Sequence, residues 1–101
     1  MIVYRAMCEE EYFDTINSNT ISWKGRFKWF GTRQFIEERV TDGKFNNSRF
    51  VKDRYCKIVI FDIAEESLSY FTKVGYRELM LDRRKSPLVK IKIIGTFNEI
   101  S

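Results

Sequence analysis

The spacing of apolar positions along the chain predicts a strand, a helix, a short strand, a second helix and then three more strands. The clearest strand lies around Ile58-Val59-Ile60-Phe61, because a continuous apolar run of this length is typical of a strand buried on both faces. In the last strand Lys90 and Lys92 alternate with apolar residues, so one face is expected to point inward. The expected strands cover residues 2–6, 28–30, 54–63, 74–81 and 88–94.

The first helix is expected over residues 9–17. Three glutamates at 9–11 suit the positive end of a helix dipole. Tyr12, Phe13 and Ile16 then form one apolar face, which we expect to be buried.

The second helix is expected over residues 33–40, with Thr32 as its N-cap. A helical turn is expected at residues 65–71. Because the helices come early and most strands come late, the order predicts an α+β fold with a small, mostly antiparallel sheet and two short helices. A chain of 101 residues is expected to form a single domain, residues 1–101.

The chain contains no histidine, which excludes His-based catalytic triads, imidazole zinc sites and histidine general bases. Cys8 and Cys56 are too few for a disulfide framework and lack metal-ligand spacing, so we expect no metal and a reducing, cytoplasmic setting. Neither a signal peptide nor an apolar run long enough to cross a membrane is visible, so no membrane association is expected.

Glu78 is the residue whose type fits its surroundings least. Within the run Val74–Leu81, a period-two alternation puts it on one face with Val74, Tyr76 and Met80. A carboxylate among apolar neighbours is costly to desolvate unless it is paired or used. Two interpretations stay open: an edge-strand acid that faces water or bridges to a lysine, and a functional carboxyl.

Two further positions carry groups that can hold an anion or a ribose. Arg5 interrupts the apolar first strand, and a buried arginine would bind phosphate or carboxylate through its planar fork. Thr32 would offer a hydroxyl and backbone amides at a helix N-terminus. Each has a plainer interpretation, Arg5 as a salt-bridged strand residue and Thr32 as an N-cap alone. Together with Glu78 they would suit a nucleotide-sugar substrate such as NAD.

The three positions, in this order, resemble the ADP-ribosyltransferase superfamily. The matching segments are Tyr4-Arg5, Phe30-Gly31-Thr32 and Arg77-Glu78-Leu79, the last followed by Pro87 and a strand. The branch concerned has an arginine on the first strand, a Ser/Thr segment on the middle strand and a catalytic glutamate late in the chain. The resemblance covers the order of elements over nearly the whole chain, and it implies a minimal ADP-ribosyltransferase-like fold that uses NAD as substrate.

The resemblance also implies a role for each matching residue. Glu78 would bind the nicotinamide ribose and drive loss of nicotinamide, as the catalytic residue of a mono-ADP-ribosyltransferase or an NAD glycohydrolase. Arg5, with Tyr4 beside it at the cofactor site, would contact NAD phosphate or ribose. Thr32 would take the place of the middle-strand hydroxyl.

An aromatic residue such as Phe50 or Phe45 would stack on nicotinamide in this scheme. The chain departs from the family at two points. The usual Ser-Thr-Ser is Phe-Gly-Thr here, and Tyr76 stands where the arginine-modifying branch has Glu or Gln. The resemblance therefore leaves the acceptor, protein or nucleic acid, unnamed.

A second hypothesis is a nucleic-acid binder or a small ribonuclease-like toxin. The net charge is +4, and the stretch Trp23–Trp29 interleaves aromatic rings with Lys24, Arg26 and Lys28. Bases would stack on the rings while the basic side chains hold phosphates. The alternative is that the rings pack into the core and the charges face water.

A third hypothesis is a non-enzymatic interaction module such as an immunity protein or inhibitor, since aromatic residues beside arginine anchor many interfaces. The three hypotheses predict different surfaces. An NAD enzyme predicts that Arg5 and Glu78 converge on one cleft. A nucleic-acid binder predicts outward Trp rings in a basic face. An interaction module predicts an exposed apolar patch without a convergent polar cleft.

Overall fold

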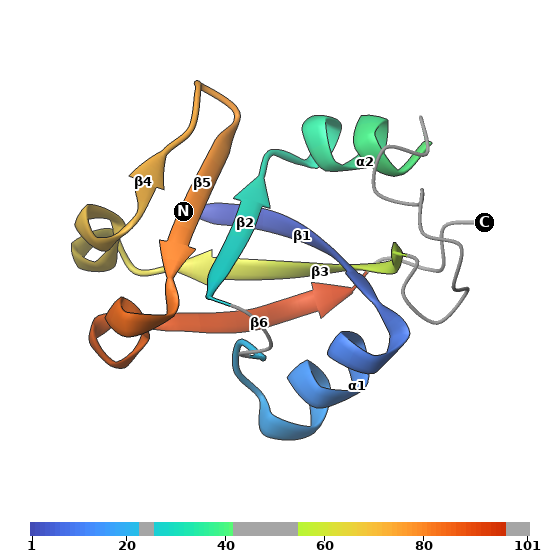
Figure 1. Ribbon diagram of the computed structural model, residues 1–101, viewed down its shortest axis with the longest axis horizontal. Coiled ribbons are helices and arrows are strands. Elements are labelled where there is room, and N and C mark those ends of the chain that lie inside the picture. The colour runs from blue at the N-terminus through green and yellow to red at the C-terminus, as the bar shows by residue number, and fades with distance from the viewer. Residues whose placement is uncertain (23–25, 42–54, 97–101) are drawn as a thin grey trace.

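A computed structural model describes residues 1–22, 26–41 and 55–96 as one antiparallel sheet flanked by short helices (Figure 1). The strands are β1 (Ile2–Cys8), β2 (Phe27–Gly31), β3 (Tyr55–Ile63), β4 (Thr72–Lys73), β5 (Glu78–Asp82) and β6 (Ile91–Thr96). The helices are α1 (Glu9–Ser18) and α2 (Arg33–Thr41), with 3-10 helices η2 (Glu65–Tyr70) and η3 (Arg83–Leu88). The predicted α+β class and antiparallel sheet are confirmed.

The strand order β4-β5-β2-β1-β3-β6 puts the first strand of the chain inside the sheet. β1 pairs with β3 along its whole length, from Ile2 opposite Asp62 to Cys8 opposite Tyr55. β2 pairs with β5 over five consecutive positions. The pairing between β1 and β2, in contrast, consists of one residue pair, Tyr4 opposite Gly31.

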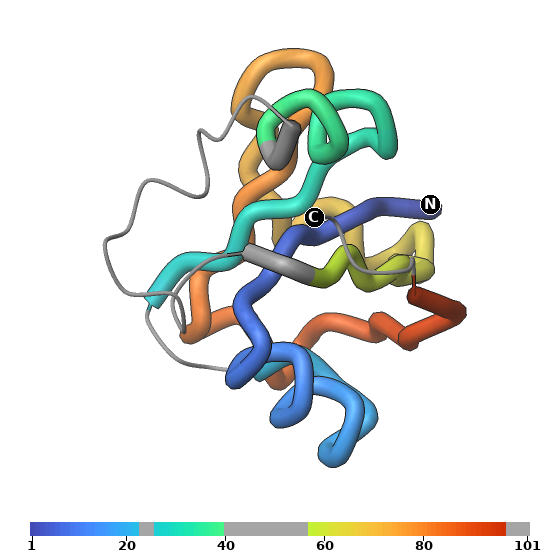
Figure 2. The backbone as a smooth tube through the Cα atoms, turned by 90° about the vertical axis from the view of Figure 1, so that its right-hand side faces the viewer, coloured from blue at the N-terminus to red at the C-terminus, as the bar shows by residue number. Residues whose placement is uncertain are grey.

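The two α-helices cover opposite faces of the sheet, as the edge-on view in Figure 2 shows. The face under α1 carries the main core, and Phe30 packs edge-on against Phe61 and Phe71 in its centre. On the other face, α2 packs Phe35 and Ile36 against the sheet. The main core consists of Val3, Met7, Ile21, Phe30, Val59, Phe61, Ile63, Phe71 and Leu81.

The predicted starts and ends of most elements are confirmed. Thr32 is the N-cap of α2, since its Oγ1 accepts a hydrogen bond from the backbone N–H of Phe35 at 3.2 Å. The last strand begins at Ile91 and not at residue 88 as predicted, because η3 extends to Leu88. Within β6 the residues alternate between half-buried and exposed, as the predicted alternation requires. None of the helices in the described part of the chain is long and apolar enough to cross a membrane.

The strand predicted over residues 74–81 is wrong in its first half. β5 begins at Glu78, and Val74–Arg77 form the tip of the β4–β5 hairpin. Gly75 has φ of +73°, a conformation that residues with a side chain rarely adopt, so the chain turns here rather than continuing as a strand. Tyr76 therefore lies at the hairpin tip and not beside Glu78 on a strand face.

The burial predicted for α1 is wrong for two of its three apolar residues, because only Tyr12 packs against the main core. Phe13 and Ile16 are exposed, while Glu11 and Thr15 are buried. Apolar periodicity fails here because Arg5 lies on the sheet beneath the helix and binds the Glu11 carboxylate. The Arg5–Glu11 ion pair, together with the packing of Tyr12 against the main core, therefore fixes which side of α1 faces the sheet.

Candidate functional site around Glu78

Glu78 lies in a row of residues that crosses three neighbouring strands. It is the register partner of Gly31 on β2, and Gly31 is the partner of Tyr4 on β1. Register partners in an antiparallel pair point to the same face of a sheet. Tyr4 packs against the cluster formed with α2, so Glu78 lies on the α2 face as well.

Gly31 is needed at the centre of this row. A Cβ at this position would come within 2.8 Å of a Phe35 ring carbon and 3.1 Å of the Arg77 carbonyl oxygen. The missing side chain lets the first turn of α2 lie directly on the sheet beside Glu78. Sequence alone places a glycine before the helix cap but does not show that the helix packs over it.

A small recess opens next to the row, where the start of β1 separates from β2. Glu78, Thr32, Tyr76 and Arg77 line it together with the exposed start of the chain at Met1. Its volume is about 50 Å³, whereas sites that enclose a whole ligand have roughly 300–1,000 Å³. The recess can therefore hold one small group and not an entire dinucleotide.

The Glu78 carboxyl is perturbed in the direction expected of a site residue. Partial burial raises its pKa above the ordinary value, and the positive charge of Arg39 on α2 opposes part of that effect. A carboxyl with a raised pKa keeps a proton to higher pH and binds hydroxyl groups in either protonation state. The pKa values of Glu11 and Asp82, in contrast, are lowered.

Thr32 is held firmly beside Glu78. Its backbone N–H donates to the Arg77 carbonyl at 3.1 Å, and its hydroxyl oxygen accepts from Phe35 N–H at 3.2 Å. The hydroxyl hydrogen remains available as a donor to a ligand in the recess. The cap interpretation of Thr32 is thus correct, and it leaves the predicted ligand contact open.

Arg5 does not join Glu78, contrary to the prediction of one shared cleft. Neighbouring residues of a strand point to opposite faces, so Arg5 faces the main core while Tyr4 belongs to the row with Glu78. There its Nε and Nη2 donate to the Glu11 carboxylate at 2.7 and 2.9 Å, and its Nη1 donates to the Trp29 carbonyl at 3.0 Å. Arg5 is the salt-bridged strand residue that its plainer interpretation describes.

Lys28 completes a buried charge cluster with Arg5 and Glu11. Its side chain is 2% exposed, and its Nζ lies 3.3 Å from Glu11 Oε1. Burial raises the pKa of Glu11, but the hydrogen bond and charge of Arg5, together with Lys28, outweigh it and hold the pKa below its ordinary value. Burial and the neighbouring Arg5 charge lower the pKa of Lys28. The prediction that Lys28 contacts phosphate is therefore wrong.

Of the other predicted site residues, Tyr4 lies near Glu78, and several fall in the part of the chain that the structure does not describe. Tyr4 lies in the Glu78 row, with its ring against Ala6, Phe35, Ile36 and Ile58. Phe50, Phe45, Lys24 and Trp23 fall outside the described residues. Tyr76, whose side chain is 88% exposed, is an aromatic residue at the recess that the nicotinamide-stacking prediction overlooked.

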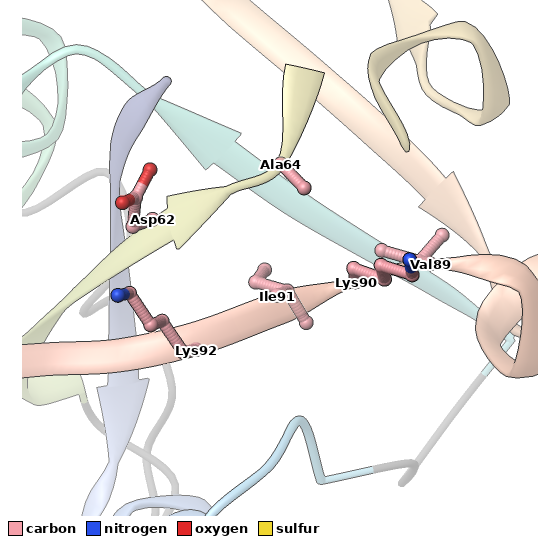
Figure 3. Close-up of a pocket in the computed structure, with 6 residues that line it drawn as sticks. All are labelled: Asp62, Ala64, Val89, Lys90, Ile91 and Lys92. Atoms are coloured by element: carbon pink, nitrogen blue, oxygen red, sulfur yellow. The ribbon is translucent and has the colours of Figure 1, made fainter. Parts of the chain in front are cut away.

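A second, larger hollow lies where β3 ends and β6 begins, with a volume of about 440 Å³ (Figure 3). Asp62 and Lys92, which are register partners, point to the same side there. The amino group of Met1 binds Asp62 Oδ1 at 3.2 Å. This hollow is an open surface and contains none of the predicted site residues.

No family model matches the chain, and no curated protein or solved structure matches it either. The geometry of the site is therefore the basis for assigning a function.

Proposed function

We propose that the protein cleaves NAD at the nicotinamide–ribose bond, as an ADP-ribosyltransferase-like enzyme or an NAD glycohydrolase, with Glu78 as its catalytic residue. The observation that carries the proposal is the adjacency of β5, β2 and β1 in the sheet. These are the strands that contain Glu78, Gly31 and Tyr4-Arg5, the segments on which the family resemblance depends. A recess between them is lined by Glu78 and Thr32.

Glu78 supplies the chemistry that this bond requires. Loss of nicotinamide leaves positive charge at the anomeric carbon, and a carboxylate beside that carbon stabilises the transition state. The Thr32 hydroxyl donates to the ribose from the capped end of α2. The recess has room for one small group, so most of NAD extends over the surface.

Arg39 and Arg77 take the phosphate-binding role that Arg5 does not fill. Arg39 is close enough to Glu78 to lower its pKa, and both guanidinium groups lie about 5 Å from the Phe35 ring centroid, at 4.9 and 5.1 Å. Arg77 reaches Glu38 at 3.3 Å through a partly exposed pair, which is weak enough to exchange for a diphosphate.

The test is nicotinamide release from NAD by the purified protein and by two variants. Glu78→Gln keeps the size and removes the charge, so release should fall by about 10²-fold or more, the loss typical when a group that stabilises transition-state charge is removed. Glu66→Gln is the matched control, since Glu66 is an exposed carboxylate on η2 outside the recess, and it should release nicotinamide at the wild-type rate.

Arg39→Gln adds an independent readout. If Arg39 binds the diphosphate in ground state and transition state alike, KM for NAD should rise while kcat changes little. Wild-type protein that releases no nicotinamide, and whose melting temperature NAD does not raise, would refute the proposal. Equal loss in Glu78→Gln and Glu66→Gln would also refute it, because the effect would then not belong to the site.

A further inference from the structure

We propose that the outer face of β2 binds single-stranded nucleic acid through two exposed aromatic rings and the arginines that flank them. This basic-aromatic surface consists of Arg26, Phe27, Trp29 and Arg84. The proposal does not depend on NAD cleavage, because none of these residues lines the recess at Glu78.

The rings face outward because of the strand alternation. Lys28 and Phe30 point into the main core, so Phe27 and Trp29 point to the opposite face. Phe27 is 40% exposed and Trp29 is 42% exposed. For Phe27, Lys28 and Trp29 the arrangement is the reverse of the interpretation in which the rings pack inward and the charges face water. It is the outward orientation that a nucleic-acid binder predicts. Arg26 is exposed, and Trp23 and Lys24 lie outside the described residues.

The aromatic pair has a regular spacing on a rigid support. Both residues belong to β2 and are held in register with β5, Phe27 opposite Asp82 and Trp29 opposite Met80. Residues two apart on a strand are separated by roughly 6.6 Å, about twice the 3.4 Å rise of stacked bases in one strand. Two bases can therefore each take one ring only if the strand is stretched and unpaired.

Asp82, the register partner of Phe27, binds two arginine side chains. The Arg26 guanidinium lies 5.0 Å from the ring centroid, and its Nη2 is 3.5 Å from Asp82 Oδ2. Arg84 binds the same carboxylate oxygen through Nη2 at 3.0 Å. One carboxylate thus positions two guanidinium groups, and the local charge stays positive.

The position of the next basic residues extends this positive charge. Arg83 begins η3, and its backbone N–H donates to the Arg26 carbonyl at 2.8 Å, so η3 starts directly beside the first residue of β2. Lys85 follows on the same short helix. The side chains of Arg26 and Arg84 are largely exposed, so both retain donors for a phosphate oxygen.

Single strands fit this surface better than duplexes. Aromatic rings stack on the face of any base, and those faces are covered in a duplex. The adjacent arginines supply the phosphate contacts that make such binding depend on salt. A protein partner would use the same aromatic anchors, but an anionic partner with flat apolar groups satisfies both the rings and the charge.

The experiment is fluorescence anisotropy of labelled oligothymidine and oligouridine with the purified full chain at about 50 and about 200 mM salt. Wild-type protein should bind, and affinity should fall at the higher salt with a slope of about −0.7 in log K against log salt for each phosphate contact. Trp29→Ala should weaken binding by roughly 5- to 150-fold, which corresponds to about 1–3 kcal/mol for one stacked base. Trp29→Phe should retain most of the affinity, because a ring remains.

Phe13→Ala is the matched control, since Phe13 is an equally exposed aromatic residue on α1 and lies outside the basic-aromatic surface. It should bind like wild type. Arg84→Gln should reduce the salt slope by about 0.7, the loss of one phosphate contact. All variants change exposed side chains, and an unchanged thermal melt confirms that each is folded. The proposal is overturned if neither oligonucleotide binds, if Phe13→Ala weakens binding as much as Trp29→Ala does, or if a duplex of the same length binds as tightly.

Discussion

The carboxylate of Glu11, on α1, lies between two cations of the sheet, Arg5 and Lys28. Arg5 contributes two hydrogen bonds to it and Lys28 a longer contact, so the cluster has two positive charges and one negative charge in a buried place. At the scale of single residues, this imbalance means that the three side chains contribute differently to the free energy of unfolding. Removing the anion leaves two like charges buried together, whereas removing Lys28 leaves a balanced, bidentate pair.

Glu11→Gln should therefore lower the free energy of unfolding by about 3–5 kcal/mol, the usual cost of removing one partner from a buried ion pair. Lys28→Met should leave it unchanged or raise it by up to about 2 kcal/mol, because a buried cation that is costly to desolvate is replaced by an apolar side chain of similar length. Urea unfolding at neutral pH measures both. A Lys28→Met protein that is destabilised as much as Glu11→Gln would contradict this account of the cluster.

At the scale of secondary-structure elements, the packing of α2 over β2 depends on one glycine, Gly31. At Gly31 a Cβ would overlap Phe35 and crowd the Arg77 carbonyl, and backbone cannot move away as easily as a side chain end. Gly95, on β6, offers a natural comparison. A Cβ there would meet one Ile60 carbon at 3.6 Å, which is an ordinary contact.

Gly31→Ala should destabilise the protein by about 1–3 kcal/mol, the typical cost of forcing extra volume into a packed place. Gly95→Ala should be neutral within about 1 kcal/mol or slightly stabilising, since it restricts the unfolded chain. Thermal melts of the two variants test the packing of α2 directly. Equal melting temperatures would show that α2 does not lie on Gly31 as described.

Five of the six strands, the two α-helices and their order could be predicted from the sequence, because each follows from local periodicity and capping. The two-residue strand β4 is too short to give such a pattern. The burial of α1 could not, since Tyr12, Phe13 and Ile16 carry the apolar signal while Glu11 and Thr15 are the buried side chains. The partner that overrides the pattern, Arg5, lies on another element. The hairpin tip was missed for a similar reason, because Val74 and Tyr76 have strand propensity and Gly75 alone signals the turn.

The candidate site was predicted in part. The row of Tyr4, Gly31 and Glu78 requires the strand order β5-β2-β1, which no local pattern specifies. The face of Arg5 was not predictable from residue type, since a shift of one residue in a strand exchanges the two faces. The outward rings of Phe27 and Trp29 follow from the same register, because Lys28 takes the inward place next to Glu11.

At the scale of the whole molecule, the perturbed carboxyls make stability depend on pH in opposite directions. The pKa of Glu11 is lowered in the folded state, so its contribution is present above its unfolded pKa, near 4.5, and is lost as the pH falls through the folded pKa. The pKa of Glu78 is raised by burial, against the opposing charge of Arg39, so its contribution is complete below about 4.5 and is lost as the pH rises through the folded pKa. The ionised Glu78 carboxylate thus costs stability at neutral pH.

Glu78→Gln removes the pH-dependent contribution of Glu78 to stability and keeps that of Glu11. The variant should be as stable as wild type near pH 4 and more stable than wild type near pH 7, with the difference growing between these values. Urea unfolding across this range provides the measurement. A variant that loses stability at pH 7 would indicate that the ionised Glu78 supports the fold, and would contradict a role confined to the site.

Because one residue pair joins β1 to β2, the sheet consists of two half-sheets with a weak boundary between them. On one side lie β4, β5 and β2, on the other β1, β3 and β6, and each set is joined by continuous backbone pairing. At this β1–β2 boundary, which we call the seam, the Tyr4–Gly31 pair is supplemented by one side-chain hydrogen bond. The Arg5 guanidinium donates to the Trp29 carbonyl. The main core also packs across this boundary, with Phe30 of β2 against Phe61 of β3, so Arg5, which Glu11 orients, is a polar link that acid can weaken. Acid that neutralises Glu11 should loosen this seam before it melts either half, and amide hydrogen exchange would then rise first at β2 residues that face β1.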